Sequence, residues 1–273
     1  MSTAIRRLRS GDVTLSTTIA GAGPALLLLH GFPDSAQVWR FQVPALANAG
    51  FTVIVPDLRG FGQSDAPADR SAYRVDHILG DLRKLLRVLR QDEPVGLVGH
   101  DWGAAIGWLF CARHPESVSR FAALSVGHPA AYRAAGLRQK LKGWYILAFQ
   151  LEGPAERMIR ADGFRFLRRV QPTLQDGERW VADLARPGRL TAALNWYRAN
   201  FREFLSASFA DVRVPVLGVY STSDVALVEA QMTGSAAHVQ AEWRYARLDG
   251  VGHWLQIERP TETNRLLLDW FKH

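Results

Sequence analysis

The sequence contains a single cysteine, Cys111, among 273 residues, so no intrachain disulfide can form. It has no apolar run of transmembrane length, and its N-terminal segment MSTAIRRLRS is charged where a secretory signal would be apolar. A glycine-rich phosphate loop and the cysteine–histidine spacings of metal sites are also missing. We therefore expect a cytoplasmic protein without membrane insertion that needs neither a metal nor an organic cofactor.

Acidic residues are fewer than basic ones, which gives a formal net charge of +7. A nucleic-acid partner would require basic residues gathered on one face or stripe. The basic residues here are scattered, and the densest group, at residues 165–169, has the spacing of a solvated helix face. The sequence therefore predicts no nucleic-acid partner, although a basic surface would attract acidic small molecules.

Short apolar runs separated by turn residues recur along the first half of the chain. Each run is predicted to be a strand buried on both faces, and the runs cover residues 25–29, 51–55, 94–98 and 121–126. Segments with helical spacing follow them at residues 35–48, 75–89 and 103–112. Because strands and helices alternate, the sequence predicts an α/β fold with a mostly parallel sheet and helices on both faces.

This alternation stops in the middle of the chain. Residues 131–211 have an almost wholly helical pattern, rich in arginine and aromatic residues. Strand patterns resume at residues 214–220 and 243–248, and a helix is predicted at 262–271. We therefore predict an α/β core made of residues 1–130 and 212–273, interrupted by a helical cap of residues 131–211.

The segment GHDWG at residues 99–103 joins a predicted buried strand to an apolar helix. Glycines two residues before and two residues after Asp101 match the spacing of a nucleophile elbow, a sharp turn that projects the central side chain above the sheet. A carboxylate that attacks an sp³ carbon forms an ester, which water can hydrolyse, so an aspartate nucleophile suits epoxides or alkyl halides. The alternative is that Asp101 only caps the following helix.

Two backbone amides are predicted to form an oxyanion hole beside Asp101. The segment HGFP at residues 30–33 follows a buried strand, and its turn can direct the amide of Phe32 toward the site. The amide of Trp102 comes directly after the nucleophile and is the second candidate. His30 lies inside the turn, where a structural hydrogen bond suits it better than catalysis.

The base and the acid of a triad are predicted to follow the nucleophile in the order acid, then histidine. His253 lies in the segment GHW at residues 252–254, after the last predicted strand. Asp224 follows the strand at residues 214–220, and it would orient the imidazole of His253. Its alternative role is that of an ordinary turn residue. His128 follows a core strand, and either a pocket-lining or a structural role fits it.

Taken together, these motifs resemble those of the soluble epoxide hydrolases of the α/β-hydrolase superfamily. The matching segments lie in the family's order along nearly the whole chain, at residues 30–33, 57–65, 99–103, 224 and 252–254. We interpret the loop DLRGFGQSD at residues 57–65 as structural. The resemblance implies the α/β-hydrolase fold with a cap over the active site.

Two cap tyrosines hold the epoxide oxygen in that family. Tyr145, in the segment WYILAFQ, resembles the first, and Tyr197, in the segment LNWYR, resembles the second. A phenol is a suitable donor because its pKa near 10 keeps it protonated at neutral pH. The alternative is that both are packing residues. The resemblance further implies an apolar epoxide bound by these tyrosines together with Phe32, Trp102, His128 and Trp254.

The mechanism that the resemblance implies is attack by Asp101 on an epoxide carbon, followed by hydrolysis of the ester by water that His253 activates. A dehalogenase with the same aspartate is the nearest alternative, and there Trp102 would have to bind the halide. A non-catalytic binding protein is a more distant alternative. The sequence leaves the choice of epoxide open and is compatible with a monomer or a homodimer.

Overall fold

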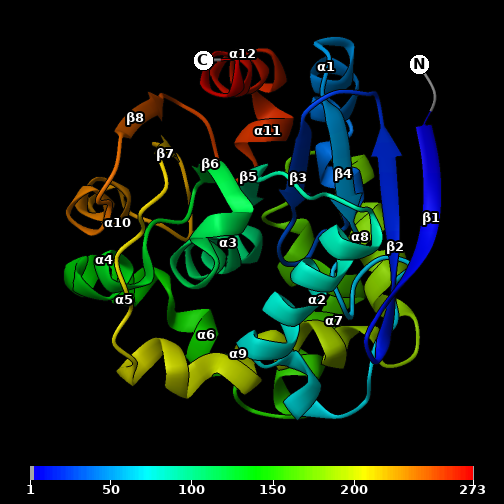
Figure 1. The fold of residues 1–273 in the computed structure, drawn as a ribbon. Coiled ribbons are helices and arrows are strands. Elements are labelled where there is room, and N and C mark those ends of the chain that lie inside the picture. Colours follow the sequence, from blue (N-terminus) through cyan, green and yellow to red (C-terminus); the bar gives the residue numbers. More distant parts are fainter. Residues whose placement is uncertain (1–2, 273) are drawn as a thin grey trace.

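This computed structural model describes residues 3–272 of the chain. Its central element is a β-sheet of eight strands (Figure 1). The strand order is β1-β2-β4-β3-β5-β6-β7-β8. Only the pairs β1–β2 and β2–β4 are antiparallel, and the other five pairs are parallel. The strands are β1 (Thr3–Ser10), β2 (Val13–Ala20), β3 (Ala25–Leu29), β4 (Thr52–Pro56), β5 (Val95–His100), β6 (Val118–Leu124), β7 (Val216–Ser221) and β8 (Trp243–Leu248).

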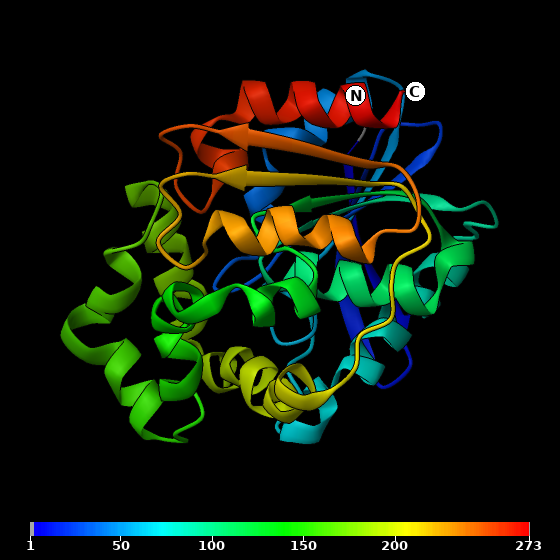
Figure 2. The same ribbon diagram turned by 90° about the vertical axis from the view of Figure 1, so that its left-hand side faces the viewer.

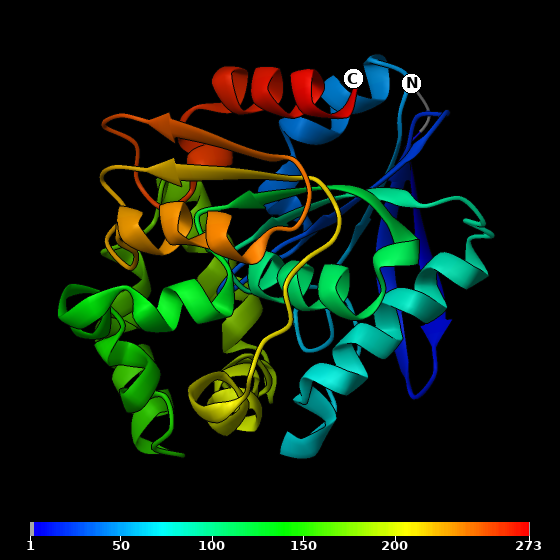
Figure 3. The same ribbon diagram turned by 60° about the vertical axis from the view of Figure 1, so that its left-hand side comes forward.

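Helices cover both faces of this sheet, as the sequence predicts. The α-helices are α1 (Gln42–Asn48), α2 (Val75–Val88), α3 (Trp102–Arg113), α4 (Pro129–Ala134), α5 (Gly136–Lys142), α6 (Trp144–Ala148), α7 (Pro154–Arg168), α8 (Leu174–Ala185), α9 (Arg189–Ser206), α10 (Glu229–Thr233), α11 (Leu255–Glu258) and α12 (Pro260–Phe271). Short 3-10 helices are η1 (Ala36–Trp39), η2 (Arg70–Tyr73), η3 (Pro115–Ser117) and η4 (Gly234–His238). Figures 2 and 3 show α1 and α12 on one face and α2, α3 and α10 on the other.

The central strands explain the parallel sheet. Every residue of β5 is buried, and so is nearly all of β3, because helices exclude water from both of their faces. The predicted α/β fold with a mostly parallel sheet is therefore confirmed. The strand β1 was not predicted, because its sequence TAIRRLRS is polar and its side chains are almost all exposed at the sheet edge.

One predicted helix is broken in the structure. The segment at residues 35–48 forms η1, a short turn, and then α1. Pro44 lies in the first turn of α1, where its missing N–H costs no hydrogen bond. A continuous helix would have placed this proline in the interior, so the helix has to begin close to it.

Helices α4 to α9 lie between β6 and β7 in the sequence, and Figure 2 shows them toward the ends at which the strand arrows point. They contain most of the predicted cap, and no strand interrupts them between β6 and β7 in the described part of the chain. The division of the chain at residues 130 and 211 stays a prediction. No helix among residues 3–272 combines the length and the apolar character that crossing a bilayer would require.

The loop at residues 57–65 anchors the cap to the sheet. Arg59 is buried and makes two hydrogen bonds, of 2.6 and 2.8 Å, to the carboxylate of Asp81 on α2. The indole N–H of Trp196, on α9, donates to the carbonyl oxygen of Arg59 at 3.0 Å. A buried, bidentate ion pair fixes the loop geometry firmly. The structural interpretation of this loop agrees with these contacts.

Candidate active site

Asp101 lies at the junction of β5 and α3 with φ 54° and ψ −122°. Such a backbone conformation is unfavourable for a residue with a side chain and persists only when the surroundings enforce it. The side chain makes no capping hydrogen bond to α3. The alternative role of Asp101 as a plain helix cap is therefore not what the geometry supports.

Neighbouring glycines make this tight turn possible. A Cβ atom on Gly103 would lie 2.1 Å from the carbonyl oxygen of Leu29, and one on Gly99 would lie 2.4 Å from that of Gly103. A Cβ atom on Gly31 would lie 2.1 Å from Asp101 Oδ1. These approaches are possible only without a side chain. The glycine spacing therefore brings β3, β5 and α3 together around one carboxylate.

The carboxylate of Asp101 is held by backbone amides. The amide of Phe32 donates to Asp101 Oδ1 at 2.7 Å, and the amide of Trp102, the next residue in the chain, lies beside the same carboxylate. Burial would raise the pKa of Asp101, but the hydrogen bond and the charge of His253, together with the amide of Trp102, lower it below its usual value. Asp101 is therefore ionised, and Oδ1 already occupies the position of an oxyanion.

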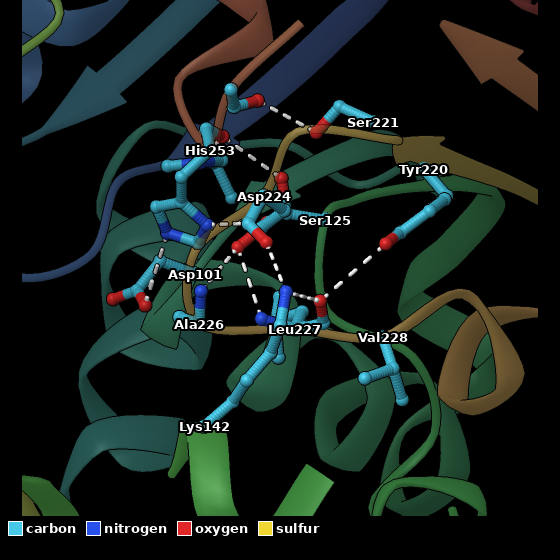
Figure 4. Close-up of polar contacts among 12 residues, drawn as sticks. Asp101, Ser125, Lys142, Tyr220, Ser221, Asp224, Ala226, Leu227, Val228 and His253 are labelled. Carbon is cyan, nitrogen blue, oxygen red and sulfur yellow. Dashed lines mark hydrogen bonds and ion pairs between the residues drawn. The ribbon is translucent and has the colours of Figure 1, made fainter. Parts of the chain in front are cut away.

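His253 lies between two carboxylates, as Figure 4 shows. Its Nδ1 lies 2.7 Å from Asp224 Oδ2, and its Nε2 lies 3.5 Å from Asp101 Oδ2. Burial would lower the pKa of His253, but the charge of Asp224 and the hydrogen bonds of both carboxylates raise it to about 10. The three side chains have the connectivity of a nucleophile, a base and an orienting acid.

Backbone contacts fix the loop that carries His253. Its carbonyl oxygen accepts from Ser125 Oγ at 3.0 Å and from His100 Nε2 at 2.9 Å. Ser221 Oγ donates to the carbonyl oxygen of Gly252 at 2.6 Å. Burial lowers the pKa of His100 to about 3, so this ring is a neutral donor. Serines at strand ends carry no distinctive sequence signal, so the role of these two serines was not predicted.

Both predicted cap tyrosines line the same cavities as Asp101. The rings of Tyr145 and Tyr197 lie 6.2 Å apart in an edge-to-face arrangement, and Tyr197 packs at 5.1 Å against Trp102. Burial raises the pKa of each phenol well above its usual value, and the nearby charge of Asp101 adds to this shift. Both phenols are therefore protonated donors.

Two cavities meet at this group of side chains. They have volumes of about 220 Å³ and about 230 Å³. Both are lined by Asp101, His253, Tyr145 and Tyr197. The first is otherwise mostly apolar, with Trp102, Ile146, Phe201 and Phe204 in its wall. The second is walled by Phe32, Phe149, Phe166 and Trp254. A nucleophile, a base and two donors thus share one apolar space.

The sequence and the structure both match known proteins. A family model described as alpha/beta hydrolase fold matches residues 24–260. "Epoxide hydrolase A" of Mycobacterium tuberculosis is 32% identical over 97% of this chain and 96% of its own length, and "Epoxide hydrolase 3" of Xenopus tropicalis is 33% identical over 91% and 71%. This chain belongs to the epoxide hydrolase family of the α/β-hydrolase fold.

Solved structures of epoxide hydrolases have the same fold as this chain. Epoxide hydrolase A from Mycobacterium thermoresistibile superimposes on the chain with a TM-score of 0.88 at 30% identity, covering 99% of this chain and 98% of that one. A Bacillus megaterium epoxide hydrolase in complex with an inhibitor superimposes with a TM-score of 0.89 at 26% identity, covering 98% and 100%. The predicted α/β-hydrolase fold and the resemblance to the epoxide hydrolases are therefore confirmed.

The predicted role of His128 as a pocket residue has to be corrected. His128 lines neither of the two cavities. Its Nδ1 accepts from the amide of Ala130 at the start of α4, and its ring stacks on His238 at 4.4 Å. A free amide at a helix N-terminus needs an acceptor, and the imidazole supplies it. His128 is thus held outside the cavities as a helix cap.

The structural role of His30 agrees with its hydrogen bonds. Its Nε2 accepts from the amide of Leu58 at 2.9 Å, and its Nδ1 lies 3.1 Å from the carbonyl oxygen of Gly31. The ring therefore connects the turn after β3 to the loop after β4. Among residues 3–272, no group of three or more histidine, cysteine, aspartate and glutamate residues is arranged to hold a metal ion.

Proposed function

We propose that this protein hydrolyses small apolar epoxides to vicinal diols through an ester on Asp101. The observation that carries the proposal is an ionised carboxylate, held at a strained turn, that shares an apolar cavity with two protonated phenols. Relatives along nearly the whole chain are named epoxide hydrolases, which supports the same reaction.

Opening of the epoxide uses the two phenols and Asp101. The hydroxyls of Tyr145 and Tyr197 donate hydrogen bonds to the epoxide oxygen and draw electron density from the ring carbons. Asp101 Oδ2 attacks one ring carbon, because Oδ1 is occupied by the amide of Phe32. The electrons of the broken carbon–oxygen bond stay on oxygen, which takes a proton from a phenol. The product of this step is a hydroxyalkyl ester of Asp101.

Hydrolysis of the ester uses His253 and the oxyanion hole. Nε2 of His253 takes a proton from water, and the resulting hydroxide attacks the carbonyl carbon of the ester. Asp101 Oδ1 becomes the oxyanion, where the amides of Phe32 and Trp102 stabilise it. The acyl carbon–oxygen bond of the ester then breaks, and the leaving diol oxygen takes the proton from His253. The new carboxyl group of Asp101 gives its remaining proton to His253, which restores the charges of the free enzyme. Asp224 stabilises the charged imidazole during this step.

The charge of Asp101 explains why His253 changes its role between the two steps. In the free enzyme both neighbouring carboxylates raise the pKa of His253 to about 10, so the ring is protonated. Esterification removes the negative charge of Asp101. The pKa of His253 then falls, because only Asp224 still favours the protonated form. The proton of His253 then replaces the one that the phenol gave to the epoxide oxygen, so formation of the ester restores both phenols and prepares the neutral base that hydrolyses the ester.

The decisive experiment is a single turnover in ¹⁸O-labelled water with enzyme in excess over an apolar epoxide. Water attacks the ester carbonyl in the proposed mechanism, so the first label enters the carboxylate of Asp101 and the first diol is unlabelled. Mass spectrometry of the peptide that contains Asp101 measures this directly. Label in the first diol would show direct attack of water on the epoxide and would exclude the ester.

A second experiment tests the phenols. The double variant Tyr145→Phe with Tyr197→Phe lacks both donors. We expect its kcat/KM for the epoxide to fall by a factor of about 10² to 10⁴. Tyr245→Phe is the matched control, because its hydroxyl bonds to Glu229 outside the cavities. Unchanged epoxide turnover in the double variant would show that another acid opens the ring.

Dehalogenation has less support from the geometry. A halide would need the indole N–H of Trp102 as a donor, but that ring packs edge-to-face at 5.1 Å against Tyr197, one of the two phenols that suit an epoxide oxygen. Ion chromatography of chloride released from a chloroalkane tests this alternative. Release faster than diol formation from epoxides would favour the dehalogenase.

A cytoplasmic location and a monomeric or homodimeric state are proposals of the same kind. The only cysteine, Cys111, is buried and free, so no disulfide calls for an oxidising compartment. Cell fractionation measures the location, and light scattering of the purified protein measures the mass in solution.

A further inference from the structure

The loop that carries the acid of the triad is short and follows β7 directly. Within residues 224–228, Asp224 Oδ1 accepts from the amides of Ala226 and Leu227 at 2.8 and 3.0 Å. This leaves Oδ2 for His253 (Figure 4). The carboxylate is therefore fixed relative to its own loop. Its direction toward His253 depends on what holds the loop as a whole.

Two side chains of the cap helix α5 bind the backbone of this loop. Gln139 is 1% exposed, and its amide nitrogen donates to the carbonyl oxygen of Ala226 while its amide oxygen accepts from the amide of Val228, both at 2.9 Å. Lys142 Nζ donates to the carbonyl oxygen of Leu227 at 2.8 Å and also to that of Asp224. Figure 4 shows Lys142 reaching the loop between these carbonyl groups.

These contacts satisfy backbone groups that the loop itself cannot pair. Three carbonyl oxygens and one amide of residues 224–228 bond to α5 side chains. A buried backbone group without a partner costs about 1–3 kcal/mol. The observed position of the loop therefore depends on the presence of α5 above it.

The same segment of the cap also carries a phenol of the site. Tyr145 follows Lys142 by three residues, on α6. The group that donates to the epoxide oxygen and the groups that hold Asp224 are thus parts of one short stretch of chain. A displacement of this stretch would move both of them.

We propose that Gln139 and Lys142 form a clasp between the cap helix α5 and the acid loop that fixes the orientation of Asp224, and so controls hydrolysis of the ester. The inference rests on the proposed function and adds two positioning residues to it. Gln139 lines the first cavity and Lys142 lines the second, but in this role they bind only the backbone of the acid loop. They act by keeping Asp224 in line with His253 Nδ1.

The clasp predicts that the two chemical steps respond differently to its loss. Opening of the epoxide needs Asp101 and the phenols, whereas hydrolysis needs a correctly oriented His253. In Lys142→Met the loop loses two hydrogen bonds, and Asp224 no longer has a fixed direction. A small misplacement of a catalytic group reduces a rate by roughly tenfold to a hundredfold. We therefore expect slower hydrolysis and accumulation of the ester.

The experiment measures both steps in single turnovers by rapid quench and mass spectrometry of the intact protein. In Lys142→Met the ester should decay roughly tenfold to a hundredfold more slowly, while its formation changes by less than about threefold. Lys142→Arg keeps a cationic donor and should restore most of the hydrolysis rate. Lys84→Met, which removes an exposed lysine of α2 that lines neither cavity, is the control and should match the unmodified protein.

Other outcomes separate the two proposals. Equal slowing of both steps, or no slowing, would overturn the clasp. Absence of any ester in the unmodified protein would overturn the proposed function instead. Gln139→Met provides an independent test and should also slow hydrolysis selectively. If Lys142→Met does not fold by circular dichroism, Lys142→Leu, which also lacks a donor, replaces it, and normal ester decay in that variant would contradict the clasp.

Discussion

At the scale of single residues, the charge of His253 is decided by its two neighbours. Asp224 lies at hydrogen-bonding distance from one ring nitrogen and Asp101 lies close to the other. Burial alone would make the ring neutral, but two carboxylates outweigh it, and the pKa rises to about 10. The same attraction lowers the pKa of Asp101. The free site therefore holds an ion pair ready for attack on a neutral epoxide.

This shift predicts a pH dependence of stability. The pKa of His253 is about 10 in the folded protein and about 6.5 in an unfolded chain, so the folded state binds the proton more tightly. The resulting stabilisation is complete below pH 6.5 and is lost as the pH rises toward 10. We expect the free energy of unfolding of the unmodified protein, relative to His253→Gln, to decline over this range.

Urea unfolding at a series of pH values measures this difference. Comparison with His253→Gln removes the contribution of lysines and tyrosines that titrate in the same range. A difference in unfolding free energy that stays constant from pH 6 to pH 10 would contradict the shifted pKa.

At the scale of single elements, the start of α3 is constrained by the backbone of β3. Gly103 lies in the first turn of α3, where a Cβ atom would meet the carbonyl carbon and oxygen of Leu29 at 2.5 and 2.1 Å. These are backbone atoms of a central strand and cannot move away easily. The position of α3, and with it the direction of Asp101, therefore depends on a missing side chain.

A pair of glycine substitutions tests this constraint. Gly103→Ala should lower the free energy of unfolding by about 1–3 kcal/mol and reduce activity, because the helix must shift away from β3. Gly80→Ala in α2 is the control, since a Cβ atom there meets nothing within 4 Å. Gly80→Ala should raise the free energy of unfolding by about 0.5–1 kcal/mol, because alanine is more stable than glycine in a helix interior. Equal effects of the two substitutions on urea unfolding would contradict the steric argument.

At the scale of the whole molecule, a buried ion-pair network joins the cap to the core. Arg179 on α8 lies 2.7 Å from Asp34 in the core and 2.8 Å from Asp176. Arg40 binds Asp176 through two nitrogens, at 2.9 and 3.0 Å. The indole of Trp254 donates to Asp34 at 3.1 Å. The network thus connects α8 to the residue that follows His253.

The network predicts strong coupling between its partners. Arg179→Met leaves the buried carboxylate of Asp34 without its cation, which we expect to cost about 3–5 kcal/mol. The double variant Arg179→Met with Asp34→Asn should lose much less than the sum of the single losses, because no unpaired charge remains. A double-mutant cycle of urea unfolding measures this coupling. Additive losses would show that cap and core are held together mainly by apolar packing.

The predicted site residues that the structure brings together have local sequence signals. The glycines around Asp101 and the HGFP turn are set by contacts within a few residues, and the structure places Asp101, His253 and both cap tyrosines around the same cavities. Asp34, Gln139 and Lys142 were missed. Their partners lie far away in the sequence, so no spacing could indicate them. The same holds for β1, whose polar sequence gives no burial signal.

The sequence by itself determined the alternation of strands and helices and the presence of an aspartate at the elbow. Both follow from local sterics and from side-chain periodicity, which act over a few residues. Only the tertiary structure decided that His253 lies beside that aspartate and Asp224 beside His253, that His128 caps a helix outside the cavities, and that a cap helix holds the acid loop. Those contacts join segments that are distant along the chain, and they form only when the folded sheet brings its strand ends together.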